Sequence, residues 1–163
     1  MTRRTDDAID PKLDLMIERT VDVPPSLVWQ AWTTPHHLKE WFCPKPWSVS
    51  ECQIDLRPGG LFHVVQVGPK DESHDIVGCY LEVVENTRLV WTLALLPGFR
   101  PAAKPFLDFT AKILMAPQGT GTHYTTIAMH GSEPEAKRHA DMGFYKGWNI
   151  AVFDQLVAYI KSR

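Results

Sequence analysis

The stretch MGFYKGWNIAVFDQLVAYIK (142–161) decides the fold of this chain, because it can form a long amphipathic helix. On a helical wheel its large apolar side chains share one broad arc: Phe144, Tyr145, Trp148, Val152, Leu156, Tyr159 and Ile160. Ser132 and Glu135 have the spacing of a capping box, and Pro134 suits a first helical turn. The sequence therefore predicts one helix over about residues 132–161, packed deeply against the rest of the domain.

Upstream of this helix the chain consists of short β-like runs separated by turn residues. The expected strands are 51–56, 61–67, 75–84, 88–96, 106–115 and 123–130. Their connections are short, as at 85–87 and 117–121, and short links join antiparallel neighbours. The pattern predicts an antiparallel meander, not a parallel sheet with crossover helices.

Before the meander, the sequence predicts one strand and two short helices. Apolar residues between Leu15 and Val23 are separated by charged ones, which is typical of a strand. Ser26 is the expected N-cap of a first helix. The Thr34-Pro35 pair ends that helix and starts a second one, which reaches Phe42.

Length and composition indicate one globular domain. The chain has 163 residues, of which 44% are hydrophobic and 22% are charged, so it can bury a substantial core. Residues 1–13 are polar and lack periodicity, and we expect them to form a flexible tail. Residues 14–163 then form a single α+β domain.

The same composition argues against several classes of partner and location. The net charge of −2, with no basic cluster longer than residues 3–4, gives no footprint for nucleic acid. Cys43, Cys52 and Cys79 have no CxxC spacing, which favours reduced thiols. There is no apolar signal region and no apolar run of about 18 residues, so we expect no membrane contact and a cytoplasmic protein.

No motif in the sequence assigns catalysis, a metal or a cofactor. The seven histidines lack metal-ligand spacing such as HExxH. GxSxG and GxGxxG motifs are also absent from the sequence. We therefore predict no metal, no cofactor and no catalytic residue.

A curved sheet gripping one helix leaves a concavity that side chains of the helix do not fill by themselves. Gly143 and Gly147 each cost roughly 1 kcal/mol against alanine in a helix interior. Two explanations remain open: the glycines bend the helix or fit a bulky residue such as Trp91, or they face a ligand.

Aromatic residues dominate the predicted pocket. The expected ligand-binding residues are Trp32, Trp41, Phe62, Tyr80, Trp91, His130, Tyr145, Trp148 and Val152.

Five segments in order give the chain a family resemblance. They are VDVPPSLVWQAWT (21–33), HLKEWFCPKPW (37–47), IDLRPGG (54–60), GCYLEVVENTRLVWT (78–92) and MGFYKGWNIAVFDQL (142–156). Together they resemble the Aha1/CalC-like branch of the START-like (SRPBCC, helix-grip, Bet v 1-like) superfamily, to which the bacterial Activator of Hsp90 ATPase homologue 1-like proteins belong. No single segment is specific for the family. The five segments occur in the family's order and spacing, and the resemblance extends over the chain from about residue 14.

The resemblance implies a β-α-α-β6-α topology, in which a curved sheet grips the last helix around a cavity. Members of the superfamily bind lipids, hormones or polyketides, and some act as cyclases or aromatases. The leading hypothesis is therefore binding of a small apolar or aromatic molecule. Domains of this branch often pair, so a homodimer is possible, although no feature of this sequence requires one.

Two alternatives remain open. The first is a cyclase, dehydratase or hydrolase that uses His63, Glu82, Asp108 or His130 as a general acid or base in the pocket. The second is a chaperone-related interaction domain with an exposed apolar patch around Phe99. Tyr80 and Glu82 share a strand face by the period of two, so the enzyme hypothesis depends on which face is buried.

Overall fold

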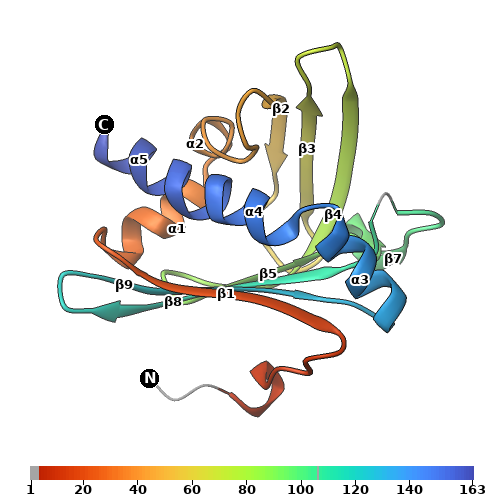
Figure 1. Ribbon diagram of the computed structural model, residues 1–163, viewed down its shortest axis with the longest axis horizontal. Coiled ribbons are helices and arrows are strands. Elements are labelled where there is room, and N and C mark those ends of the chain that lie inside the picture. Colours follow the sequence, from red (N-terminus) through yellow and green to blue (C-terminus); the bar gives the residue numbers. More distant parts are fainter. Residues whose placement is uncertain (1–3, 106) are drawn as a thin grey trace.

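The structure, a computed structural model, describes residues 4–105 and 107–163. It contains a seven-stranded antiparallel sheet with the strand order β1-β9-β8-β5-β4-β3-β2 (Figure 1). The strands are β1 (Asp14–Val21), β2 (Ser48–Ile54), β3 (Leu61–Val67), β4 (Ser73–Val84), β5 (Arg88–Thr92), β8 (Thr110–Gln118) and β9 (Gly121–Met129). The predicted α+β helix-grip fold is confirmed.

The sheet bends around the C-terminal helix. In Figure 1, β1, β9, β8 and β5 form a floor, whereas β4, β3 and β2 rise beside the helix as a wall. The register between β2 and β3 shifts at Val49/Glu51, and that between β4 and β5 shifts at Tyr80/Glu82. Such bulges bend a strand and increase its local twist, which helps the sheet to curve.

Two short helices close one end of the concavity. They are α1 (Pro25–Thr33) and α2 (Pro35–Leu38). The predicted cap is wrong by two positions, because Pro24 is the N-cap of α1 and makes no side-chain cap bond. Proline at the first helical position explains this start, since its missing N–H has no partner to lose there.

Several predicted strand ends also move. The run expected at 88–96 stops at Thr92 and is followed by a small hairpin of β6 (Leu95–Leu96) and β7 (Arg100–Pro101). The short helix η2 (Pro97–Phe99) joins these two strands. The strand predicted from position 106 begins at Thr110, and position 106 itself lies outside the described residues.

The C-terminal helix is capped as predicted but is not continuous. The Ser132 side chain accepts a hydrogen bond from the Glu135 backbone N–H at 3.3 Å. Helix α3 (Glu133–Asp141) is followed by Met142 and by Gly143, whose φ of +95° lies in the left-handed region. A new helix starts at Phe144 and continues as α4 (Phe144–Trp148), the π-helical segment η3 (Asn149–Gln155) and α5 (Leu156–Lys161). Gly143 therefore separates α3 from the gripped helix.

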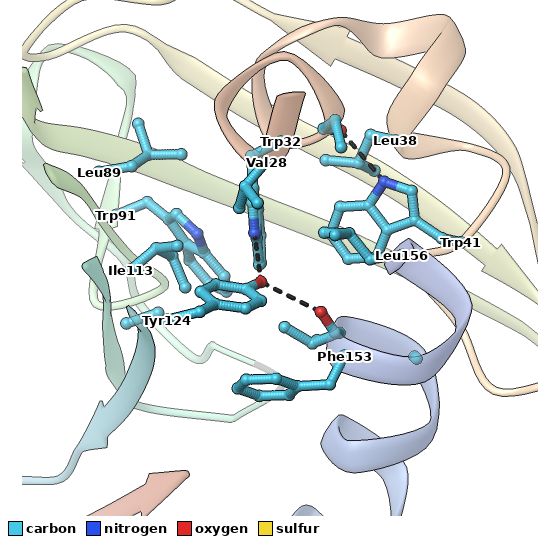
Figure 2. Close-up of a cluster of buried hydrophobic side chains, with 14 of the residues drawn as sticks. Val28, Trp32, Leu38, Trp41, Leu89, Trp91, Ile113, Tyr124, Phe153 and Leu156 are labelled. Atoms are coloured by element: carbon cyan, nitrogen blue, oxygen red, sulfur yellow. Dashed lines mark hydrogen bonds between the residues drawn. The ribbon is translucent and has the colours of Figure 1, made fainter. Parts of the chain in front are cut away.

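A buried chain of hydrogen bonds joins the three layers of the core (Figure 2). The Trp32 indole N–H donates to the Tyr124 hydroxyl at 2.7 Å, and that hydroxyl donates to the Val152 carbonyl at 3.1 Å. Trp32 and Tyr124 are fully buried. Burial also raises the pKa of Tyr124, so the hydroxyl keeps its proton.

The N-terminal segment packs against the sheet through one buried carboxylate. Residues 1–13 were predicted to be a flexible tail, and residues 1–3 lie outside the described residues. Thr5–Asp7 form a short 3-10 helix that places Asp7 on the outer face of the sheet, where its side chain is 2% exposed. Asp7 accepts hydrogen bonds from Arg88 at 2.6 Å and from Lys112 at 2.9 Å. Desolvation opposes the charged carboxylate, but these two bonds outweigh it and lower its pKa.

No helix among the described residues combines the length and the apolar character needed to cross a membrane.

We expect Asp7→Asn to lower the free energy of unfolding by about 2–4 kcal/mol. The substitution removes the carboxylate and leaves the buried cations that pair with it without a counter-charge. Urea unfolding at neutral pH measures the effect. Asp6→Asn is the matched control, since Asp6 is exposed and pairs with Arg4, and exposed pairs contribute little. Equal stability of the two variants would contradict the role given to Asp7.

The two helix glycines are expected to respond oppositely to alanine. Gly143→Ala forces a side chain into the left-handed region and should destabilise the protein by about 1 kcal/mol. Gly147 lies inside a helix, and an added Cβ would meet Pro44 at an ordinary 3.7 Å, so Gly147→Ala should stabilise it by up to about 1 kcal/mol. Thermal unfolding of both variants tests this, and effects of the same sign would count against it.

Candidate functional site

A cavity of about 200 Å³ lies between the C-terminal helices and the sheet. Strands β3, β4 and β5, the loops on either side of the small hairpin, and the loop after α2 contribute the other walls. Its lining consists of Phe42, Pro44, Gln66, Ile76, Trp91, Leu93, Leu107, Phe109, His139, Met142, Gly143, Phe144, Gly147, Trp148, Ala151 and Val152. Met142 is half exposed, and it marks the side at which the cavity meets solvent.

Three of the predicted ligand-binding residues line this cavity: Trp91, Trp148 and Val152. Trp91 comes from the sheet, and the other two come from the gripped helix. The structure therefore places the cavity against the helix face predicted from the sequence.

The other predicted aromatic residues lie elsewhere. Trp32 and Trp41 are buried in the core with their rings 4.8 Å apart, and Phe62 stacks on Trp91 at 4.5 Å. Tyr80 is also fully buried and does not line the cavity. These residues form the packed layer behind the cavity, because the sheet and α1 leave no room beside them.

Tyr145 is 47% exposed and points away from the core, although it fell on the predicted apolar arc. The arc was drawn for one continuous helix, whereas the chain restarts at Phe144 after the left-handed Gly143. The restart rotates the first turn of α4, so Phe144 is buried and Tyr145 is not.

His139 is a site residue that the sequence analysis missed. It lies on α3, where the expected continuous helix would have carried it away from the sheet. The break at Gly143 folds α3 back, and the His139 ring then contacts Phe109 at 4.6 Å and Phe144 at 5.0 Å. The sequence feature that could have predicted this break is a glycine directly followed by an aromatic residue.

The loop that carries Phe42 and Pro44 was also missed, and Gln155 holds it in place. The Gln155 amide donates to the carbonyls of Trp41 at 3.0 Å and Cys43 at 2.7 Å. Its oxygen accepts from the Lys45 backbone N–H at 3.1 Å. One side chain of the gripped helix thus fixes the loop that closes one wall of the cavity.

His130 lies behind His139 instead of in the cavity wall. Its Nδ1 is 2.8 Å from the Leu13 carbonyl oxygen, and its Nε2 is 2.9 Å from His139 Nδ1. Burial, with smaller contributions from the nearby His130 and Arg138, lowers the pKa of His139 to about 3. His139 is therefore neutral at physiological pH.

Three buried polar atoms have no hydrogen-bond partner within the described part of the chain: the Tyr80 hydroxyl, the Trp91 indole N–H and the Thr126 hydroxyl. Buried polar groups are rarely left unpaired, since the loss costs about 1–3 kcal/mol. The Trp91 ring lines the cavity, but its indole nitrogen is buried and does not reach the open space. His139 and the Gln66 amide bring polar groups to the lining.

The other acid–base candidates do not line the cavity. His63 pairs with Asp75, and Asp108 is exposed. Glu82 binds Arg88 at 3.1 Å and Arg4 at 2.9 Å beside the N-terminal segment. The expectation that Tyr80 and Glu82 share a face is wrong, because the bulge between them breaks the period of two.

The three cysteines form no disulfide bond, and burial suppresses the ionisation of two of them. Cys43, Cys52 and Cys79 are free. Burial raises the pKa of Cys43 to about 12 and that of Cys52 to about 11, so both stay protonated at neutral pH. Within residues 4–105 and 107–163, no group of three or more His, Cys, Asp or Glu side chains is arranged to hold a metal ion.

The predicted interaction patch lies on the small β6–β7 hairpin. Phe99 is 51% exposed and Leu96 is 38% exposed. Both side chains are therefore accessible, and the interaction role stays a prediction.

Comparison with known proteins identifies the family. The model of the Activator of Hsp90 ATPase homolog 1-like proteins matches residues 22–161. The chain belongs to this family. No curated protein matches the chain.

Solved structures of other family members and similar folds agree with this assignment. A protein of Nitrosomonas europaea is 45% identical, with a TM-score of 0.90 over 94% of this chain and 97% of that one. A protein of Rhodobacter sphaeroides shares 18% identity, with a TM-score of 0.79 over 93% and 94% of the two chains. An AHSA1-like protein of Aeromonas hydrophila shares 19% identity, with a TM-score of 0.70 over 92% and 93%. The last two likenesses concern the fold alone.

The buried His139 predicts a specific pH dependence of stability. Its pKa in the folded chain is about 3 against an ordinary 6.5, so between these values the unfolded chain binds a proton that the folded chain does not. The free energy of unfolding should therefore fall as the pH drops below about 6.5. His139 contributes at most about 1.4 kcal/mol per pH unit to this fall.

Urea unfolding between about pH 7.5 and pH 5 measures this dependence in the wild type, in His139→Phe and in His36→Gln. The His139→Phe variant should lose less stability over this range than the wild type. The exposed His36 provides the control, and because its own effect is limited to a lowered pKa of the neighbouring His37, His36→Gln should change the pH dependence less than His139→Phe does. Identical pH dependence in all three proteins would rule out a buried neutral His139.

Proposed function

We propose that this protein binds a small apolar or aromatic molecule in the cavity between the sheet and the C-terminal helix. The observation that supports this most directly is an apolar lining that carries two polar side chains, Gln66 and His139. Ligand sites are typically apolar concavities with a few polar groups that fix orientation.

The size of the cavity limits the ligand. Engineered apolar cavities of about 150 Å³ accept benzene, whereas drug-sized ligands occupy about 300–1,000 Å³. The value of about 200 Å³ lies between these limits. It favours a molecule with one ring over a polycyclic one.

The wall of the gripped helix supports the same proposal. Gly147 and Ala151 are four residues apart, so they lie on one face of the helix, and both line the cavity. Their small side chains leave the space that a leucine at either position would fill. The cavity therefore depends on two specific small residues, and one substitution can test it.

A one-ring ligand would bind with modest affinity. Burial of about 200 Å² of apolar surface contributes on the order of 5 kcal/mol before ordering costs. The corresponding dissociation constants lie at roughly 0.1–1 mM. Calorimetry and NMR both measure affinities in this range.

We expect Ala151→Leu to abolish binding of p-xylene, because three added carbons occupy the cavity while the fold is retained. The probe is titrated into the full-length protein, and the Trp indole N–H resonances are followed by NMR. The apparent affinity should fall at least about tenfold, the equivalent of about 1.4 kcal/mol.

Ala158→Leu is the matched control for this substitution. Ala158 belongs to the same helix but is exposed, so the variant should bind p-xylene as the wild type does. Unchanged binding by Ala151→Leu would place the ligand outside the cavity. Absence of binding by the wild type of both p-xylene and its hydroxylated analogue p-cresol would overturn the proposed function.

A further inference from the structure

The cavity lining carries no formal charge. Among the described residues that line it, none is Asp, Glu, Lys or Arg, and the one histidine is His139. An ionised ligand placed there would lose its hydration without gaining a counter-charge, which is costly in an apolar site. The lining therefore selects a neutral molecule.

The hydrogen-bond chain behind His139 fixes which of its nitrogens carries hydrogen. A backbone carbonyl can only accept, so the contact with Leu13 places a hydrogen on His130 Nδ1. In neutral His130, Nε2 is then bare and accepts from His139 Nδ1–H. This arrangement leaves His139 Nε2 without hydrogen, as an acceptor.

His139 Nε2 is also free to meet a ligand. It makes no hydrogen bond with any residue in the described ranges 4–105 and 107–163. Because Nδ1 is directed to His130, the opposite edge of the ring, which carries Nε2, is the part left for the cavity that His139 lines. The neutral pair thus offers one acceptor to a ligand.

An acceptor such as His139 Nε2 binds a ligand that donates a hydrogen bond. A hydroxyl is the smallest neutral group of an organic ligand that does so. It can therefore satisfy His139 Nε2, whereas a hydrocarbon cannot.

The remaining walls favour an aromatic ring. The rings of Phe109, Phe144 and Trp148 surround His139 with centroid distances of 4.6, 5.0 and 6.5 Å. Aromatic rings gain energy from edge-to-face and offset contacts beyond the area that they bury. A planar ring fits this part of the lining better than a flexible chain of the same volume.

We propose that the ligand of this cavity is a neutral one-ring aromatic alcohol or phenol, whose hydroxyl group donates a hydrogen bond to His139 Nε2. The His130–Leu13 contact positions His139 for this role. The proposal rests on the proposed function and narrows it to one class of ligand.

Three probes of similar shape test the proposal on the full-length protein at about pH 8, where a phenol with an ordinary pKa near 10 is neutral. They are p-cresol, p-xylene, in which a methyl group replaces the hydroxyl, and benzoate, which is charged. Calorimetry should show p-cresol binding at least about tenfold more tightly than p-xylene, and benzoate binding most weakly.

One variant assigns the preference to His139. His139→Phe should retain p-xylene binding and lose the preference for p-cresol. His36→Gln, at an exposed position, should bind all probes as the wild type does. In the wild type, p-cresol should also shift the ¹⁵N resonance of His139 Nε2 more than p-xylene does, a measurement that needs no variant.

The outcomes separate the two proposals. If p-cresol and p-xylene bind equally, or if the preference survives His139→Phe, the hydroxyl class is wrong while the cavity remains a binding site. If benzoate binds as tightly as p-cresol, selection for a neutral ligand is wrong. If none of the three probes binds, the proposed function itself fails.

Discussion

The chain of hydrogen bonds from Trp32 through Tyr124 to the Val152 carbonyl is the constraint on which the rest of the structure depends. It joins the first helix, the sheet and the gripped helix at one buried point. Each of these groups would cost about 1–3 kcal/mol if it were buried without a partner, so the three layers can adopt few other relative positions. The acceptor lies in the π-helical segment η3, a local distortion that often marks functional regions.

This constraint explains why the cavity lies beyond the aromatic core and not within it. Trp32, Trp41 and Phe62 pack around the fixed point and leave no space there. On the gripped helix, Ala151, which directly precedes Val152, and Gly147, about one turn earlier, have too little side chain to reach the sheet. The loop held by Gln155 and the returning helix α3 then enclose the remaining space.

The two faces of the sheet differ in their electrostatics. The outer face carries Asp7, Arg88 and Lys112, whose charges compensate one another under the N-terminal segment. The cavity lining contains neutral groups, and the titratable His139 stays uncharged because burial and its neighbours disfavour the proton. Charge is therefore kept away from the apolar space, which suits a neutral ligand and opposes an ionised one.

The sequence by itself determined the α+β class, the antiparallel meander, the capped start of α3 and three cavity residues on the gripped helix and sheet. These features follow from periodicity and turn chemistry, which act over a few residues. It did not determine the break at Gly143, the bulge between Tyr80 and Glu82, the burial of Asp7 or the His130–His139 pair. Each of these depends on which distant groups meet, and a left-handed glycine or one extra residue in a strand redirects every side chain that follows it. Only the tertiary structure decided that His139 lines the cavity and that Tyr145 does not.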